Sequence, residues 1–364
     1  MLLLFNEETG GHGGDLAEAL EKWNPPGGKF IDFSSNINPL GPPPGLLKHL
    51  RNVMPEMISY PTPQARILRE ELARFFEVSA QRLVVGNGAN ELIHFIILHN
   101  KPGRVFVPAP SFSEYERAAN LSGSEVIYYS IFPEEKIYLE KLPVKPAEQD
   151  LIVVCNPNNP TGTIFPRSDL LELIDHAEKA GASVMLDESF MLLTGTNSDS
   201  LCNFPSDNLW VVVSLTKLWG LPGLRLGCMI GPAEEINRIT RYSDPWRVNT
   251  IAQKAGLYCI KCHDYLNKTL ELINTERSYL VHQLTGLKCF EIYKGAANYL
   301  LIKGVSDGFN VIELQSYLAG KGILIRRADN FKGLDHRFFR IAIKKRIENK
   351  ELVRELTRWV QKEV

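Results

Sequence analysis

One lysine of this chain stands where a lysine is not expected as a simple surface charge. Lys217 directly follows Ser214-Leu215-Thr216, which comes after the apolar run 210–213. In a cleft at the end of a buried strand, desolvation lowers the pKa of an amine, and a neutral amine can form a Schiff base with an aldehyde. The hydroxyls of Ser214 and Thr216, with Arg225 further along the chain, are suited to binding a phosphate. The alternative is an ordinary lysine at a strand end.

Two more segments place a polar side chain directly after an apolar run. Asp187 ends the run 184–186, where a carboxylate can pair with a protonated ring nitrogen. The commoner role of an aspartate at such a turn is to cap a helix. Asn159 lies in the proline-rich loop 155–162, which leaves its amide to donate to a ligand oxygen, although turn formation alone also explains this composition.

A glycine-rich turn at 86–91 is the fourth candidate segment. Gly88, Ala89 and Asn90 lie between the apolar run 83–85 and a predicted helix. The turn matches only the first half of G-x-G-x-x-G, so it is a weak indication of a dinucleotide site. A glycine turn that aims helix N–H groups at a phosphate is still physically favourable.

These four segments must be positioned by a sheet that is covered on both faces. Six runs rich in β-branched residues, several of them apolar without alternation, predict buried and mostly parallel strands. They lie at 83–85, 105–107, 126–129, 151–154, 184–186 and 210–213. Helical spacing at 91–98 and 168–180 fits between them, with Gly181 at the expected C-terminal cap. This alternation predicts an α/β protein with a doubly wound sheet.

Past Trp246 the pattern changes to that of a smaller α+β unit. A single long helical span is predicted over 250–284. Shorter strands are predicted at 299–302, 323–325 and 339–343, with helices near 311–320 and 350–362. The Gly- and Pro-rich opening, 10–14 and 39–44, is expected to be mostly loop.

Composition and charge exclude several classes of protein. Apolar residues make up 44% and charged residues 23% of the 364, so a large core can form. The net charge of −1 gives no electrostatic footprint for nucleic acid or an anionic membrane. No apolar run reaches the roughly twenty residues of a membrane-spanning helix. The N-terminus lacks the basic region of a signal peptide, so we expect a cytoplasmic protein.

Six cysteines in a chain of this length do not predict a disulfide framework. One spacing, Cys259 to His263, spells the haem-attachment motif C-x-x-C-H. Because it falls inside the predicted helical span, packing is the favoured interpretation. No second C-x-x-C completes a set of four zinc ligands, so no metal site is predicted.

Together and in this order, the four segments resemble the fold type I pyridoxal-phosphate enzymes of the aminotransferase superfamily, over essentially the whole chain. The resemblance implies pyridoxal 5′-phosphate as the cofactor and a large domain around a mostly parallel seven-stranded sheet. Residues 41–250 are expected to form this cofactor-binding domain. Residues 251–364 are expected to form an interdomain helix and a small α+β domain, which residues 1–40 join, reaching the active site.

The resemblance also assigns roles to residues. Lys217 matches the catalytic lysine that binds the cofactor aldehyde and shuttles protons. Asp187 matches the catalytic aspartate that keeps the pyridine nitrogen protonated, so that the ring can accept electrons. Asn159 matches the amide that donates to the 3′ oxygen of the ring. The residues that match the phosphate cup are Gly88, Ala89, Asn90, Ser214, Thr216 and Arg225.

Three further matches concern the ring, the partner subunit and the substrate. Phe112 matches the aromatic residue that stacks on the pyridine ring. Tyr60 matches a tyrosine that reaches the cofactor phosphate of the neighbouring subunit, which implies a homodimer with shared active sites. Arg340 matches the arginine that grips the substrate α-carboxylate. The chain departs from many aminotransferases at Phe190, where they have a tyrosine that donates to the 3′ oxygen.

Within the superfamily, the segments 12–14, 32–41, 245–249 and 323–326 are similar to the threonine-phosphate decarboxylases of cobalamin biosynthesis. This similarity implies decarboxylation of O-phospho-L-threonine to (R)-1-amino-2-propanol phosphate and CO2. The substrate contacts that it implies are His12, Asn36, Asn159, Arg326 and Arg340. The alternative is a histidinol-phosphate aminotransferase, which shares the four segments. A non-catalytic regulator is disfavoured, since no basic helix-turn-helix-like extension precedes the fold.

Overall fold

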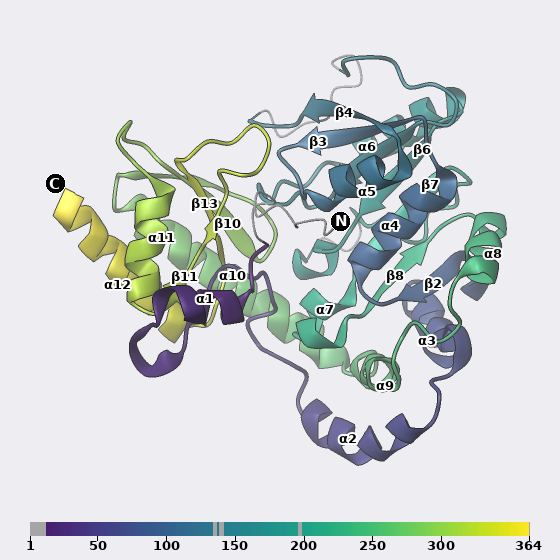
Figure 1. The fold of residues 1–364 in the computed structure, drawn as a ribbon, viewed down its shortest axis with the longest axis horizontal. Coiled ribbons are helices and arrows are strands. Elements are labelled where there is room, and N and C mark those ends of the chain that lie inside the picture. The colour runs from purple at the N-terminus through teal and green to yellow at the C-terminus, as the bar shows by residue number, and fades with distance from the viewer. Residues whose placement is uncertain (1–11, 134–136, 138–141, 196–198, 364) are drawn as a thin grey trace, which may run out of the picture.

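A computed structural model describes residues 12–133, 137, 142–195 and 199–363 (Figure 1). Its main element is a seven-stranded sheet in the order β2-β8-β7-β6-β5-β3-β4. The strands are β2 (Leu83–Gly86), β3 (Arg104–Ala109), β4 (Glu125–Ser130), β5 (Leu151–Cys155), β6 (Ser183–Asp187), β7 (Leu209–Ser214) and β8 (Gly227–Ile230). The six predicted strands and the mostly parallel α/β sheet are confirmed. The short β8 escapes the sequence patterns, and it runs antiparallel to both of its neighbours.

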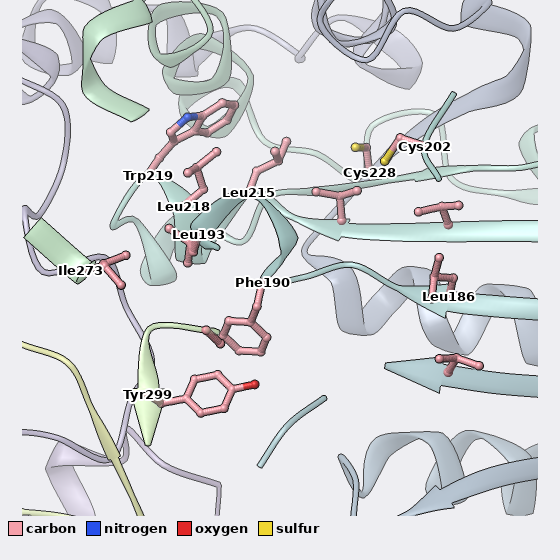
Figure 2. Packing of buried hydrophobic residues seen from close by; sticks show 14 of the residues in the cluster. Leu186, Phe190, Leu193, Cys202, Leu215, Leu218, Trp219, Cys228, Ile273 and Tyr299 are labelled. Atoms are coloured by element: carbon pink, nitrogen blue, oxygen red, sulfur yellow. The ribbon is translucent and has the colours of Figure 1, made fainter. Parts of the chain in front are cut away.

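Helices cover both faces of this sheet, which explains the uninterrupted apolar runs. Along β7, Val211 and Val213 belong to one apolar cluster, whereas Trp210 and Val212 belong to another. The first cluster includes residues of α3 (Arg66–Phe75), α6 (Arg167–Lys179) and α9 (Thr250–Cys259), and the second those of α4 (Ala89–Asn100), α5 (Glu114–Ser122) and α8 (Ala233–Tyr242). Figure 2 shows the first cluster reaching Phe190 and Tyr299, so the core continues beyond the large sheet.

A second, antiparallel sheet is built from the C-terminal part of the chain, in the order β12-β13-β10-β9. Its strands are β9 (Phe290–Tyr293), β10 (Tyr299–Gly304), β12 (Arg326–Arg327) and β13 (Phe338–Ala342), with α11 (Val311–Gly320) and α12 (Arg346–Glu363) beside them. The predicted strand at 323–325 is confirmed at its first two residues, and a separate strand begins directly after it. Its first part, β11 (Ile323–Leu324), pairs in parallel with β1 (Ile31–Asp32), and β12 then begins at Arg326.

The N-terminal segment packs against this C-terminal part of the chain. The described parts of the predicted loop stretches, 12–14 and 39–44, contain no helix or strand. Between them lies α1 (Leu16–Trp23), which was not predicted and whose N-terminus is capped by the Asp15 carboxylate accepting from the Glu18 amide. Ala19 of α1 packs with Ala319 and Leu324, and Figure 1 shows α1 beside α11. Gly10 and Gly11 of the predicted loop lie outside the described residues. The second stretch of the opening is loop until α2 (Leu46–Val53).

The predicted helical span at 250–284 is two helices. α9 ends at Cys259, and α10 (His263–Thr285) begins after a short turn. Neither glycine nor proline marks this break in the sequence, so the apolar spacing runs through it. The C-x-x-C-H motif therefore lies at the junction, with Cys259 buried in the core. Within the described ranges, no three His, Cys, Asp or Glu side chains gather as metal ligands.

The other described elements are short. They are α7 (Leu215–Leu218) and the 3₁₀ turns η1 (Pro26–Gly28), η2 (Met54–Ile58), η3 (Pro63–Ala65), η4 (Ala80–Arg82), η6 (Met191–Leu193) and η8 (Pro222–Leu224). Of the helices in the described part of the chain, none combines the length and the apolar character needed to cross a membrane.

Candidate active site

A cavity of about 450 Å³ opens at the carboxyl edge of the parallel strands, between the large sheet, the N-terminal segment and the C-terminal sheet. It brings together most of the residues singled out from the sequence. The predicted residues that line it are His12, Asn36, Ala89, Asn90, Phe112, Asn159, Asp187, Ser214, Thr216, Lys217, Arg225, Arg326 and Arg340. Gly88 does not line the cavity itself but packs against Arg225, which does. Tyr60 lies elsewhere, 82% exposed.

Lys217 enters this cavity from α7, the single helical turn that follows β7. Burial lowers the pKa of its amine, while the nearby Asp187 carboxylate acts in the opposite direction. Its Nζ lies 4.8 Å from the ring centroid of Phe190. The amine therefore faces an aromatic ring. Because residue 190 is a phenylalanine and not a tyrosine, it offers no hydroxyl to the amine or to a ligand.

Asp187 ends β6, next to β7 in the sheet, and is buried. Its Oδ2 accepts a hydrogen bond of 2.6 Å from the hydroxyl of Tyr115, and its Oδ1 accepts one of 2.9 Å from the backbone amide of Ser189. The second bond resembles the capping role considered from the sequence, but the side chain also lines the cavity. Burial raises the pKa of Tyr115 well above its usual value, so the phenol stays a hydrogen-bond donor.

A group of donors surrounds the opposite end of the cavity. The N-terminus of α4 begins at Ala89 after Gly88, and no side chain caps it, so its first N–H groups are available to an anion. The hydroxyls of Ser214 and Thr216 lie 3.1 Å apart. Arg225 packs against Gly88 so closely that a Cβ there would lie 2.6 Å from its Nη2. The residues predicted for the phosphate cup thus lie together at this part of the cavity.

Arg340 and Asn159 join the C-terminal sheet to the loop after β5. Nη1 of Arg340 donates to Oδ1 of Asn159, and Nη2 donates to the carbonyl of Ser34 at 2.8 Å. Because its oxygen is engaged, the amide nitrogen of Asn159 is the group left to donate to a ligand. Nε of Arg340 is buried and has no hydrogen-bond partner among the described residues.

Arg326 and Arg340 lie opposite each other as paired residues of β12 and β13. Burial lowers the pKa of Arg340 to about 9, and the neighbouring Arg326 adds to this effect. Burial likewise lowers the pKa of Arg326 to about 10. Neither guanidinium forms a salt bridge within the described ranges: Arg326 donates to the Arg327 carbonyl at 2.6 Å and to Asn330 at 2.9 Å. The two cations are thus arranged to receive anions.

The remaining predicted residues line the cavity from the N-terminal segment and from the loop before α5. Asn36 is 5% exposed, and its buried Oδ1 has no hydrogen-bond partner among the described residues. Phe112 packs edge-on against Tyr115, with the ring centroids 5.7 Å apart. The ring of His12 lies 5.5 Å from that of Phe112.

Sequence reasoning missed several residues of the site. Tyr115 sits on the buried face of α5, where a tyrosine is indistinguishable from a core residue. Cys155 ends β5 within the cavity lining, and burial raises the pKa of its thiol to about 12. Asp32 and Lys344 also line the cavity. The only available signal was positional, since polar residues that follow strands gather at one edge of an α/β sheet.

The cavity wall holds an excess of positive charge. Two aspartates, Asp32 and Asp187, face five basic side chains, which are Lys217, Arg225, Arg326, Arg340 and Lys344. An excess of cations in a concave site favours ligands with several negative charges.

The site combines a lysine just after one strand with a buried aspartate at the end of the neighbouring strand. With an uncapped helix N-terminus in the same cavity, at the carboxyl edge of such a sheet, these residues define a pyridoxal-phosphate-dependent enzyme of fold type I. The chain belongs to the family "Aminotransferase class I and II", whose profile matches residues 28–356.

Individual relatives carry two kinds of name. A protein of Caldanaerobacter subterraneus subsp. tengcongensis, provisionally named a threonine-phosphate decarboxylase, is 36% identical over 91% of this chain and 92% of its own length. The threonine-phosphate decarboxylase of Salmonella typhimurium is 32% identical over 97% of this chain and 96% of its own. The solved histidinol-phosphate aminotransferase of Clostridium acetobutylicum has a TM-score of 0.83 and 27% identity, over 91% of this chain and 99% of that one.

The residues present fit pyridoxal 5′-phosphate. The phosphate cup would hold its phosphate, and Asp187 would hold the ring nitrogen. The free amide of Asn159 would donate to the ring oxygen, and Phe112 would stack on the ring. Lys217 supplies the amine with a lowered pKa that an aldehyde requires.

Replacing Gly88 tests the phosphate cup. In Gly88→Ala, the added Cβ must displace Arg225, and the residue must also keep a φ of +93°. We expect the affinity for pyridoxal 5′-phosphate to fall by roughly tenfold or more, the loss of one charged hydrogen bond. Titrating the cofactor-free protein with pyridoxal 5′-phosphate, followed by absorbance, measures this.

The matched control is Gly27→Ala. Gly27 has a similar φ of +74°, but an added Cβ would meet nothing within 4 Å. This variant carries the same kind of backbone strain away from the cavity, so its cofactor affinity should equal that of the wild type. Unchanged affinity in Gly88→Ala would show that Arg225 does not form part of the cup.

Proposed function

We propose that this protein decarboxylates O-phospho-L-threonine to (R)-1-amino-2-propanol phosphate and CO2 with pyridoxal 5′-phosphate, as a step of cobalamin biosynthesis. The observation that carries the proposal is the pair Arg326 and Arg340, two guanidiniums without an ion-pair partner in the described ranges, facing the cavity that also holds Lys217. A substrate with a carboxylate at one end and a phosphate at the other matches two such cations. The names of the two sequence relatives support the same substrate.

The paired arginines give the substrate a fixed orientation. Arg340 is held by Asn159 and Ser34, so its guanidinium direction is set before a ligand arrives. We assign the α-carboxylate to Arg340 and the phosphate to Arg326, with His12 and Asn36 beside it. Fixing both anionic ends stops rotation about the bonds of Cα, and this determines which bond at Cα can break.

The cofactor, when bound, supplies a conjugated ring that accepts the electron pair released from the bond between Cα and the carboxylate. The chain supplies the protons and their placement. The lowered pKa of Lys217 allows Nζ to give a proton to Cα after CO2 has left. The Asp187 carboxylate stabilises a proton on the ring nitrogen, and Tyr115 and the Ser189 amide hold that carboxylate in place.

A histidinol-phosphate aminotransferase is the second candidate, because the solved enzyme from Clostridium acetobutylicum superposes on 91% of the chain. Its substrate carries an amine and a phosphate but no carboxylate. Such a substrate would engage Lys217 and one of the two arginines. The products distinguish the two reactions.

The direct test is a product assay. Incubation of the holoenzyme with O-phospho-L-threonine should release CO2 and form aminopropanol phosphate, without a requirement for 2-oxoglutarate. The variant Lys217→Ala, which lacks the amine, should release none. Amino-group transfer from histidinol phosphate to 2-oxoglutarate, with no gas from O-phospho-L-threonine, would favour the second candidate and reject the first.

Arg326→Ala tests the substrate phosphate. Removing this guanidinium should raise KM for O-phospho-L-threonine by roughly ten- to a hundredfold, the expected effect of one charged hydrogen bond. The affinity for the cofactor should not change, because Arg326 lies on the C-terminal sheet, away from the phosphate cup. Steady-state kinetics together with cofactor titration check both parts. An unchanged KM removes Arg326 from the substrate site.

We also propose that the enzyme works as a homodimer, with Tyr60 directed to the partner's cofactor phosphate. An apolar surface near Tyr60 supports this, formed by Met54, Met57, Ile58, Tyr60 and Trp246. Ile58 is 94% exposed, and the ring of Tyr60 lies 5.0 Å from that of Trp246. Exposed apolar residues grouped in this way commonly mark a contact between protein surfaces.

An acidic substitution tests this contact. Sedimentation should give the wild-type protein twice its chain mass of 41.1 kDa. Ile58→Asp should shift it towards the single-chain mass and lower the activity, since the site then lacks Tyr60. The control is Ile347→Asp on α12, where an isoleucine that is 79% exposed should tolerate the change. A wild-type protein at the single-chain mass contradicts the proposal.

A further inference from the structure

A buried carboxylate outside the cavity lining has no role in the chemistry described so far. Glu114 is the first residue of α5 and is only 3% exposed. Burying an ionised carboxylate is unfavourable unless hydrogen bonds compensate for the lost water. Glu114 therefore has to be explained by its partners.

Four side chains surround this carboxylate. Oε1 accepts from Nε2 of His12 at 3.1 Å, and Oε2 from Nε2 of His94 at 3.2 Å. Oε2 also accepts from Nδ2 of Asn90 at 3.1 Å and from Nη1 of Arg117 at 3.5 Å. The bonds from His12 and His94 hold the pKa of Glu114 well below its usual range, so it stays ionised.

The partners come from separate parts of the chain. Asn90 and His94 lie on α4, whose N-terminus belongs to the phosphate cup, and His12 lies in the N-terminal segment. Glu114 thus attaches His12, at the start of the described N-terminal segment, to helices of the large sheet. His12 itself is 55% exposed, so packing alone does not fix its ring.

The residues next to His12 are fixed from the other side. The Gly14 amide donates to Oγ of Ser34 at 2.9 Å, and a Cβ at Gly13 would lie 2.3 Å from the Ser34 carbonyl oxygen. That same carbonyl accepts from Arg340. The segment 12–14 therefore connects Glu114 to the C-terminal sheet, which carries Arg326 and Arg340.

His12 also lies between two cavities. Besides the main one, a cavity of about 320 Å³ is lined by His12, Ser34 and Arg326, and these residues line both. Since Nε2 of His12 bonds to Glu114, Nδ1 is the ring nitrogen left for a ligand at this boundary. An imidazole has a nitrogen on each side of the ring, so a histidine that bonds to a carboxylate through Nε2 still presents Nδ1 to a second ligand.

We propose that Glu114 is a positioning residue, which holds His12 so that its Nδ1, together with Arg326, binds the phosphate of the substrate. This inference rests on the proposed function, in which the substrate carries a phosphate. By holding His12, Glu114 would favour binding of phosphorylated substrates over unphosphorylated ones. Glu114 acts through His12 and touches neither the substrate nor the cofactor.

The test combines Glu114→Gln and His12→Ala in a double-mutant cycle. Each single variant should raise the KM for O-phospho-L-threonine roughly ten- to a hundredfold and leave kcat within about twofold. The double variant should be no worse than His12→Ala, since Glu114 acts through that ring. The affinity for pyridoxal 5′-phosphate should not change in either single variant.

The control is Glu116→Gln on the same helix, where the carboxylate bonds to Tyr128 instead. Its kinetics should equal those of the wild type. An unchanged KM in His12→Ala overturns the proposal even if Glu114→Gln fails to fold. Multiplying effects in the double variant, or weaker cofactor binding in Glu114→Gln, would place Glu114 in the phosphate cup through Asn90 and also overturn it. If the wild type releases no CO2 from O-phospho-L-threonine, the proposed function fails first, and this inference fails with it.

Discussion

The site depends on keeping Lys217 and Asp187 in one cavity without letting them form an ion pair. Asp187 ends β6, and Lys217 lies on α7 directly after the neighbouring β7, but no salt bridge joins the two side chains. Both carboxylate oxygens are instead occupied, by the hydroxyl of Tyr115 and by the amide of Ser189. Burial therefore has the larger effect on the amine and lowers its pKa, although the nearby Asp187 carboxylate acts in the opposite direction. The carboxyl edge of one sheet thus positions both a reactive amine and a fixed carboxylate.

The positive charge of the cavity comes from two independent sources. Arg225 packs against Gly88 and lies just before β8 of the large sheet. Arg326 and Arg340 are instead paired on the C-terminal sheet. The N-terminal segment connects the two, because β1 pairs with β11 and His12 bonds to Glu114 of α5. The arginine suited to the cofactor phosphate and the two arginines suited to the substrate therefore face one cavity, although they lie at different sheets.

Much of this arrangement could be predicted from the sequence, since strand runs and the polar residues after them are local patterns. Asp187 ends the five-residue strand β6 and Lys217 follows the six-residue strand β7, and both strands are almost entirely buried; the order of the segments identified the fold. Other features depend on contacts between distant residues. Tyr115 and Glu114 look like ordinary residues of an amphipathic helix until Asp187 and His12 are placed beside them. The break after Cys259 and the short β8 carry no local signal, because packing decides both.

The pairing of β1 with β11 has a consequence for how such a site can change. It joins Asp32 and Ser34 to the part of the chain that carries the two paired arginines, whereas Lys217 follows a strand of the large sheet. The residues suited to gripping the two ends of a ligand are therefore carried by other elements than the reacting amine. Selectivity and reactivity can then diverge separately during evolution, which suits a scaffold reused for many amino compounds.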